Sequence, residues 1–225
     1  MIIYLIRHAR QESTLCNVNV PLAEEGKRQA ELLGKRMQKY PLDALYTSDL
    51  IRAVQTARIA FKDCKELLEQ RVEKKELREF NFGSLTGVAD GEVKAFYKNY
   101  YEEMKKKMSD VPATGLHVQP DFLDMEYPEG ENGKQVFARV WQVIEEMIAG
   151  EKQHIAVVTH GGVIRVLMAA LFGKGIENRL LFGTSLENCG ITQIHYDKDK
   201  QLFYLDRFND YAHLEEAPEL LRHNW

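Results

Sequence analysis

Two short apolar runs, each with a histidine within two residues of its end, constrain the fold of this 225-residue chain more than any other feature. The first, Ile2-Ile-Tyr-Leu-Ile6, leads into Arg7 and His8, and the second, Ile155-Ala-Val-Val-Thr159, leads into His160. A continuous apolar run of this length, bounded by turn signals, is typical of a strand buried on both faces in a parallel sheet. The sequence therefore predicts an α/β fold.

The position of the two histidines after these strands suggests a shared site. Ligands of open α/β sheets bind beyond the carboxyl ends of the strands. We therefore expect His8 and His160 to face one crevice, although they are far apart in the chain. This pairing makes the chain an enzyme candidate.

The rest of the chain alternates apolar strand patterns with amphipathic helix patterns, which predicts a three-layer α/β/α sandwich with a mostly parallel central sheet. The predicted strands span residues 2–6, 43–47, 67–72, 155–159, 191–196 and 202–208, the last two as an antiparallel pair. The predicted helices span residues 24–39, 90–108, 134–149 and 162–171, and a further helix begins after the capping residues Ser48 and Asp49. We interpret residues 1–225 as one domain in which a helical insertion, approximately residues 83–133, covers the pocket.

Composition excludes several classes of protein. A net charge of −4 provides no basic surface for nucleic acid or an anionic membrane. Cys16, Cys64 and Cys189 are widely spaced and include no C-x-x-C pair, which indicates reduced thiols rather than a disulfide framework or zinc site. No charged leader precedes the first apolar run, and no apolar stretch approaches the roughly 20 residues that span a bilayer. We expect a cytoplasmic protein.

Five residues form a set suited to phosphoryl transfer: Arg7, His8, Arg52, Glu79 and His160. Arginines donate charge-assisted hydrogen bonds to the oxygens of a phosphomonoester, which carries about −1.5 to −2 charge near neutral pH. A neutral imidazole can attack phosphorus when its other nitrogen is held by a hydrogen bond, and a carboxylic acid can protonate the leaving alkoxide. This chemistry requires neither a metal nor a cofactor.

Ordered motifs over most of the chain resemble the histidine phosphatase superfamily, which is also called the phosphoglycerate-mutase-like family. The resemblance rests on Leu5-Ile-Arg-His8, Pro21-Leu-Ala-Glu-Glu-Gly-Lys-Arg-Gln-Ala30, Tyr46-Thr-Ser-Asp-Leu-Ile-Arg-Ala-Val-Gln-Thr-Ala57, Leu77-Arg-Glu79 with Phe82-Gly83, Val158-Thr-His-Gly161, Asn188-Cys-Gly-Ile-Thr192 and Asn209-Asp-Tyr-Ala-His-Leu214. It implies that His8 is the nucleophile and transient phosphate carrier. It also implies that Arg7, Arg52 and His160 bind the phosphoryl oxygens and that Glu79 is the proton donor and later the base.

The chain departs from the family pattern near the nucleophile. Ala9 replaces the usual glycine, which reduces the freedom of the backbone there. Asn17 comes later than the usual phosphate-contacting asparagine, so either Asn17 or Thr14 is a candidate for that contact. Arg10 is a further candidate for phosphate binding or the substrate rim. The last candidate is Gly161, directly after the second histidine.

These observations together predict a metal-independent phosphomonoesterase, a phosphoric monoester hydrolase that acts on a small phosphorylated metabolite through phosphohistidine. The alternative within the same chemistry is a phosphoglycerate mutase. An alternative of another class is an inactive phosphate-binding or regulatory protein on the same fold. Hydrolysis of tyrosine phosphoproteins also stays open. The expected partner is a small phosphorylated substrate, without nucleic acid or membrane, and a homodimer is left open.

Overall fold

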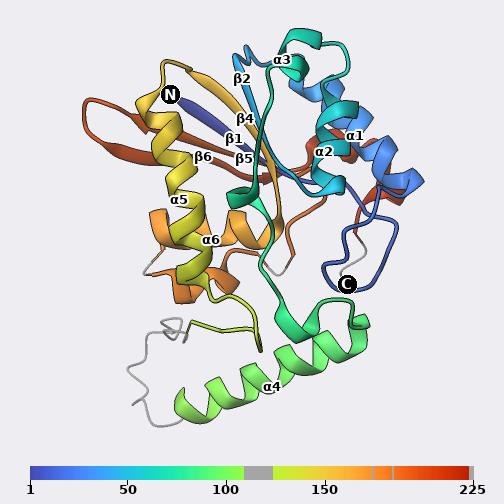
Figure 1. The fold of residues 1–225 in the computed structure, drawn as a ribbon, viewed down its shortest axis with the longest axis vertical. Helices are drawn as coiled ribbons and strands as arrows, with labels where there is room; N and C mark the ends of the chain where they lie inside the picture. Colours follow the sequence, from blue (N-terminus) through green and yellow to red (C-terminus); the bar gives the residue numbers. More distant parts are fainter. Residues whose placement is uncertain (109–123, 174, 184, 223–225) are drawn as a thin grey trace.

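The computed structural model describes residues 1–108, 124–173, 175–183 and 185–222, which form a six-stranded sheet covered by helices (Figure 1). The strand order is β3-β2-β4-β1-β5-β6. The strands are β1 (Ile2–Arg7), β2 (Ala44–Ser48), β3 (Val72–Lys74), β4 (His154–Thr159), β5 (Ile191–Asp197) and β6 (Leu202–Asp210). The first four are parallel, and β5 pairs antiparallel with both β1 and β6. The predicted mostly parallel sheet is confirmed.

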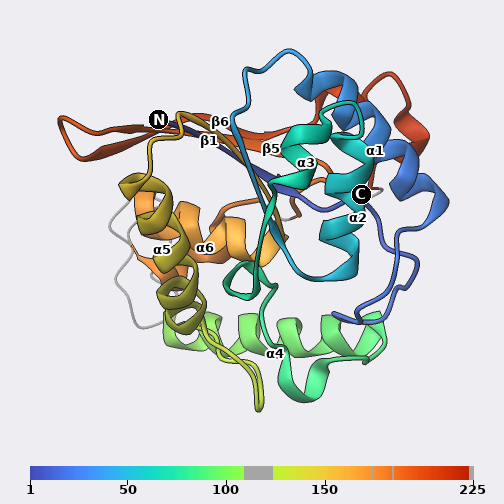
Figure 2. The ribbon, with the colours of Figure 1, turned by 45° about the horizontal axis from the view of Figure 1, so that its top comes forward.

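Helices cover both faces of the sheet, as Figures 1 and 2 show from two directions. On one face lie α1 (Glu24–Met37), α2 (Ile51–Ala60) and α3 (Lys65–Glu69), and on the other lie α5 (Gly133–Ala149) and α6 (Gly161–Phe172). The three predicted layers are therefore present. None of the helices that the structure describes is both long and apolar enough to cross a membrane.

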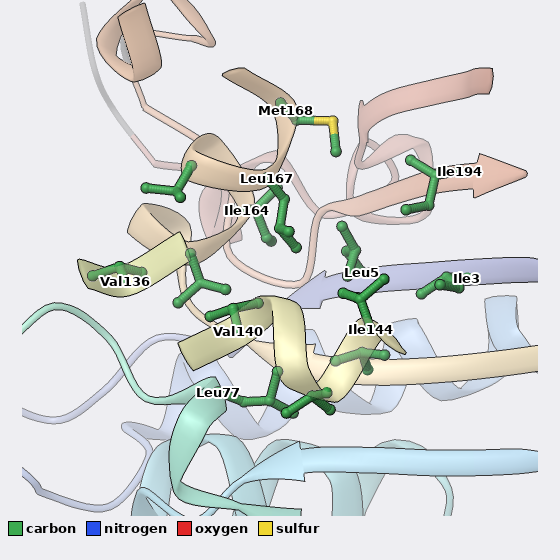
Figure 3. Packing of buried hydrophobic residues seen from close by; sticks show 14 of the residues in the cluster. Ile3, Leu5, Leu77, Val136, Val140, Ile144, Ile164, Leu167, Met168 and Ile194 are labelled. Carbon is green, nitrogen blue, oxygen red and sulfur yellow. The ribbon is translucent and has the colours of Figure 1, made fainter. Parts of the chain in front are cut away.

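Alternate side chains of the central strand β1 pack in two separate hydrophobic cores, one on each face of the sheet. Ile3 and Leu5 of β1 pack in the core under α5 and α6, whereas Tyr4 and Ile6 pack in the core under α1 and α2. Figure 3 shows Ile3 and Leu5 together with residues of α5 and α6, including Ile144. Because successive side chains of a strand point to opposite faces, one apolar run supplies both cores. This explains why the run is apolar at every position.

The sequence of helix α5 accounts both for where the helix begins and for the face that it buries. Asn132 accepts a hydrogen bond from the backbone N–H of Gln135, and the Gln135 side chain accepts one from the Asn132 N–H, which completes a capping box. Val136, Val140 and Ile144 recur every four residues, so they lie on one face and are buried against the sheet.

Two local predictions were wrong. Residues 67–72 are not a strand, because Leu67 and Leu68 belong to α3 and only Val72 begins the short strand β3. Two adjacent leucines carry no periodicity that separates helix from strand. The side chains of Ser48 and Asp49 do not cap α2, whose N-cap is Leu50 without a side-chain hydrogen bond. Asp49 instead pairs with Arg78.

The predicted insertion, residues 83–133, contains a short 3₁₀ turn, Gly83–Leu85, and α4 (Asp90–Met108). Helix α4 lies apart from the two helical layers, beyond one end of the sheet (Figures 1 and 2). Residues 109–123 of the predicted insertion lie outside the described residues. The division into one domain with an insertion remains our interpretation.

Candidate active site

The register of the sheet brings the two histidines together. Strands β1 and β4 pair in parallel with Arg7 opposite Thr159, so the next residues, His8 and His160, leave the sheet side by side. Their ring centroids lie 5.0 Å apart. The two histidines therefore lie together, as predicted; His8 lines a cavity, and His160 is fully buried.

His8 has the tautomer and the charge of a nucleophile. Its Nδ1 lies 2.7 Å from the carbonyl oxygen of Ala9, and because a carbonyl only accepts, Nδ1 carries the proton and Nε2 keeps a lone pair. Nε2 accepts a hydrogen bond of 3.2 Å from the Nε of Arg52. Burial, then the charges of Arg52 and Arg7, hold the pKa of His8 well below 6.5. The imidazole is therefore neutral at neutral pH.

The backbone around His8 is fixed by neighbouring side chains. Asn188 donates from Nδ2 to the His8 carbonyl at 2.8 Å, and the N–H of Ala9 donates to Thr56 Oγ1 at 2.9 Å. Ala9 is fully buried in the core under α1 and α2, and it is not among the non-glycine residues with positive φ. The alanine that replaces the usual glycine therefore fits without backbone strain.

His160 is fully buried and presents an unpaired nitrogen. Its Nε2 lies 2.9 Å from the hydroxyl of Ser48, and its Nδ1 has no hydrogen-bond partner among the described residues. Burial, followed by the charge of Arg52, lowers the pKa of His160 well below 6.5. A buried imidazole nitrogen without a partner suits an oxygen of a bound ligand.

Two arginines supply the positive charge. Arg52 is 2 % exposed and donates from Nη1 to Val18 O and from Nη2 to Asn17 Oδ1, so part of its donor fork is still free. Arg7 donates from Nη1 to Leu186 O, and its Nε is buried without a partner in the described part of the chain. Burial lowers the pKa of Arg7 to about 9, so this arginine stays protonated at neutral pH.

Glu79 lies at the amino end of α6. Its Oε2 accepts from the N–H of Gly162 at 3.1 Å, and its Oε1 accepts from the N–H of Phe80 at 3.0 Å. A Cβ at Gly162 would lie 2.3 Å from Oε1, so only glycine leaves room for the carboxylate there. Glu79 lines the site, whereas nearby Glu76 does not.

Two adjoining cavities, of about 560 and 570 Å³, open beside these residues. The His8 cavity is lined by His8, Arg52 and Asn188, and the neighbouring cavity is lined by Gly161, Arg165 and side chains of α4. Both cavities are lined by a common set of residues, namely Arg7, Thr14, Cys16, Glu79, Phe82, Asp90 and Arg222. The two cavities therefore meet at the catalytic candidates, as the site of a substrate larger than phosphate requires.

The three remaining candidates for phosphate binding, Asn17, Thr14 and Arg10, have different surroundings. Asn17, in a left-handed conformation with φ of 49°, reaches Arg52 and also donates from Nδ2 to Phe80 O at 2.9 Å. Thr14 is exposed and lines both cavities. Arg10 lines the His8 cavity, but its guanidinium donates to the carbonyls of Leu220 and Leu221. A direct phosphate contact of these residues stays a prediction.

Sequence reasoning missed four residues of the site: Ser48, Arg165, Asn188 and Arg222. Ser48 and Asn188 lie inside motifs that were recognised, but their partners depend on the sheet register and on a turn. Arg165 follows Gly161 by one helical turn, a spacing that does place it beside the site. Arg222 follows an unremarkable stretch near the end of the chain, and no signal in the sequence marks it.

We expect the protein to unfold more easily as the pH falls below about 6.5. In the unfolded chain His8 and His160 bind protons near this pH, whereas the folded protein holds both pKa values well below it. The unfolded state then binds more protons, so the free energy of unfolding falls by up to about 1.4 kcal/mol per pH unit for each histidine. Urea unfolding between pH 7 and 5.5 measures this slope, and His160→Gln should make it shallower. An equal slope in the variant would contradict the prediction.

Comparison with known proteins agrees with this geometry. Residues 3–210 match the histidine phosphatase superfamily (branch 1). The chain is 28 % identical over 204 residues to "Metal-independent phosphoserine phosphatase" from Arabidopsis thaliana, covering 89 % of this chain and 76 % of the relative. It is 25 % identical over 229 residues to "2,3-bisphosphoglycerate-dependent phosphoglycerate mutase" from Neisseria meningitidis, covering 92 % and 99 %.

The fold also matches solved structures. A mycobacterial glucosyl-3-phosphoglycerate phosphatase in complex with inorganic phosphate superimposes with a TM-score of 0.74 at 22 % identity, covering 94 % of this chain and 98 % of that one. At this identity the likeness supports the phosphoglycerate-mutase-like fold alone. The match over residues 3–210 goes further: this chain is a member of the histidine phosphatase superfamily.

Proposed function

We propose that the protein is a metal-independent phosphomonoesterase that hydrolyses a small phosphorylated metabolite through a phosphohistidine at His8. One observation carries the proposal: Nε2 of a neutral, buried His8 accepts a hydrogen bond from Arg52, and the buried Arg7 Nε and His160 Nδ1 have no partner among the described residues. Fixed cations and donors of this kind stabilise the charge on a transferring phosphoryl group.

In the first step, the lone pair of His8 Nε2 forms a bond to phosphorus while the bond from phosphorus to the ester oxygen breaks. Nδ1 keeps its proton and donates it in a hydrogen bond to the Ala9 carbonyl, which helps to stabilise the positive charge that develops on the ring. Glu79 supplies a proton to the leaving oxygen. The alcohol then departs through the neighbouring cavity, which Glu79 also lines.

In the second step, a water molecule attacks the phosphorus of phosphohistidine. Glu79 accepts a proton from this water, the bond between phosphorus and nitrogen breaks, and neutral His8 returns with its lone pair. Arg7, Arg52 and His160 hold the same phosphoryl oxygens in both steps. The products are an alcohol and inorganic phosphate, and the protein ends in its starting state.

Hydrolysis rather than mutase activity is favoured by the open site. The two cavities that meet at Glu79 give water access to phosphohistidine. The relative named as a metal-independent phosphoserine phosphatase also supports hydrolysis, whereas the relative named as a mutase shows that the same fold can transfer the group instead. The intact set of His8, Arg7, Arg52, Glu79 and His160 argues against an inactive protein.

A product assay tests this function. The purified protein is incubated with 3-phosphoglycerate and with a panel of small phosphomonoesters, in the presence of excess chelator. We expect free phosphate to accumulate from at least one of them. Accumulation of 2-phosphoglycerate without free phosphate would instead establish a mutase. Phosphate binding without turnover of any ester would establish a non-catalytic protein.

A further inference from the structure

Two arginines of the neighbouring cavity, Arg165 and Arg222, have no task in the reaction proposed above. Arg165 donates from Nε to Phe182 O at 3.2 Å and from Nη2 to Gly183 O, and both partners are neutral carbonyls. Within the described residues, neither Arg165 nor Arg222 forms an ion pair with a carboxylate. Buried or half-buried charges of one sign without such a partner are costly unless a ligand balances them.

The backbone that carries Arg222 is held in place at the rim. The guanidinium of Arg10 donates to the carbonyls of Leu220 and Leu221, at 3.0 and 3.2 Å. The N–H of Arg222 donates to the Glu187 carboxylate at 3.0 Å. These contacts position Arg222, which lines both cavities at their junction. Arg10 is therefore a positioning residue for Arg222.

The wall of the neighbouring cavity carries more positive than negative side chains, and the carboxylate of Glu187 acts on Arg222 from outside this lining. Lys94 is already paired with Asp90 at 2.7 Å, and Arg179 is paired with Asp124. The other charged side chains that line this cavity are three arginines and the single carboxylate of Glu79. A bound phosphoryl group occupies Arg7, so two arginines are left over.

The positive charges of Arg222 and Arg165 act on Arg7, where the carboxylates of Glu79 and Glu187 oppose them. Burial, then the charge of Arg222, and further the charge of Arg165, lower the pKa of Arg7 to about 9. The pKa of Arg222 is lowered by burial first, and the charge of Arg165 contributes. An anion bound between them would relieve this repulsion and would gain charge-assisted hydrogen bonds.

We propose that Arg222, with Arg165 of the same cavity, binds a second anionic group of the substrate while the phosphoryl group lies at His8. The proposal rests on the proposed phosphomonoesterase function and narrows its substrates to phosphomonoesters that carry a carboxylate or a second phosphoryl group. The planar guanidinium fork suits either anion, and it does not suit a neutral hydroxyl equally well.

Matched substrates test this subsite. The pair 3-phosphoglycerate and glycerol 3-phosphate differs only in a carboxylate that replaces a hydroxymethyl group. Propane-1,3-diol bisphosphate beside its monophosphate tests a second phosphoryl group in the same way. We expect the parent protein to prefer, in at least one pair, the member that carries the second anionic group. Arg222→Gln should lower that preference, measured as the ratio of kcat/KM values, by about 10- to 100-fold, mainly through KM.

The controls separate the possible failures. Arg222→Lys should restore part of the preference, Arg10→Gln should reduce it, and Arg58→Gln, at an exposed position of α2, should leave it unchanged. If Arg222→Gln lowers kcat/KM equally for both members of a pair, Arg222 contacts the transferring phosphoryl group and the subsite is wrong. A parent protein that hydrolyses 4-nitrophenyl phosphate but prefers neither 3-phosphoglycerate nor the bisphosphate over its partner in the pair also overturns the subsite alone. A parent that hydrolyses no phosphomonoester overturns the proposed function itself.

Discussion

Replacing His8 with alanine should lower kcat for 4-nitrophenyl phosphate by at least about 10⁴-fold. The variant keeps Arg7, Arg52 and His160, but it loses the imidazole whose Nδ1 is held by the Ala9 carbonyl and whose Nε2 faces Arg52. Arg52 could still bind a phosphoryl group in the variant, so substrate affinity should survive better than turnover. Steady-state kinetics with a sensitive phosphate assay measure both quantities.

The covalent intermediate gives the prediction a second, independent readout. Parent protein mixed with a ³²P-labelled substrate and quenched in alkali should retain label, which is then lost in acid, as expected of a phosphohistidine. His8→Ala should retain none. His195→Ala is the matched control, since this histidine lies on β5 outside both cavities. Label retained in the His8 variant, or turnover close to that of the parent, would refute His8 as the nucleophile.

The part of the site that sequence could predict is the part fixed by strand ends. The apolar runs that end at Arg7 and Thr159 are neighbours in the sheet, so the residues after them had to meet. Periodicity alone predicts that both runs are buried, but it does not predict their adjacency. The rule that ligands of open α/β sheets bind beyond the carboxyl ends of the strands led to the expectation of a shared site, and the register of β1 and β4 brings the two histidines together.

The part that sequence could not predict depends on contacts between distant segments. Ser48 had the sequence signature of a helix cap, but the neighbouring strand β4 places His160 within 2.9 Å of its hydroxyl. Arg10 looked like a phosphate ligand because of its place after His8, but the carbonyls of the C-terminal segment attract its guanidinium. Local patterns contain no information about such partners, which are brought near only by the completed fold.

The choice between Glu79 and Glu76 shows the same limit. The two glutamates are three residues apart, and sequence alone favours Glu79 only through the resemblance. In the structure Glu79 accepts hydrogen bonds from Gly162 and Phe80 and lines both cavities, whereas Glu76 lines neither. Its role as acid and base is still a prediction that kinetics must test.

Glu79→Gln should affect the two chemical steps differently according to the leaving group. An alkyl phosphate releases a strongly basic alkoxide, so loss of the proton donor should lower kcat/KM by about 10²- to 10⁴-fold. 4-Nitrophenolate is a stable anion that leaves without a proton, so formation of phosphohistidine from 4-nitrophenyl phosphate should be largely spared. Attack by water still lacks its base, because a glutamine amide cannot accept the proton.

The variant should therefore show a burst. Rapid mixing with 4-nitrophenyl phosphate should release about one nitrophenolate per active site, followed by slow turnover while phosphohistidine accumulates. Glu76→Gln, three residues away and outside both cavities, should behave as the parent does. If Glu79→Gln lost the same factor with alkyl and aryl substrates and showed no burst, Glu79 would hold the site in shape through the Gly162 N–H rather than transfer protons. Because the leaving group and the burst report on separate steps, agreement of both would assign the acid and the base to one carboxylate.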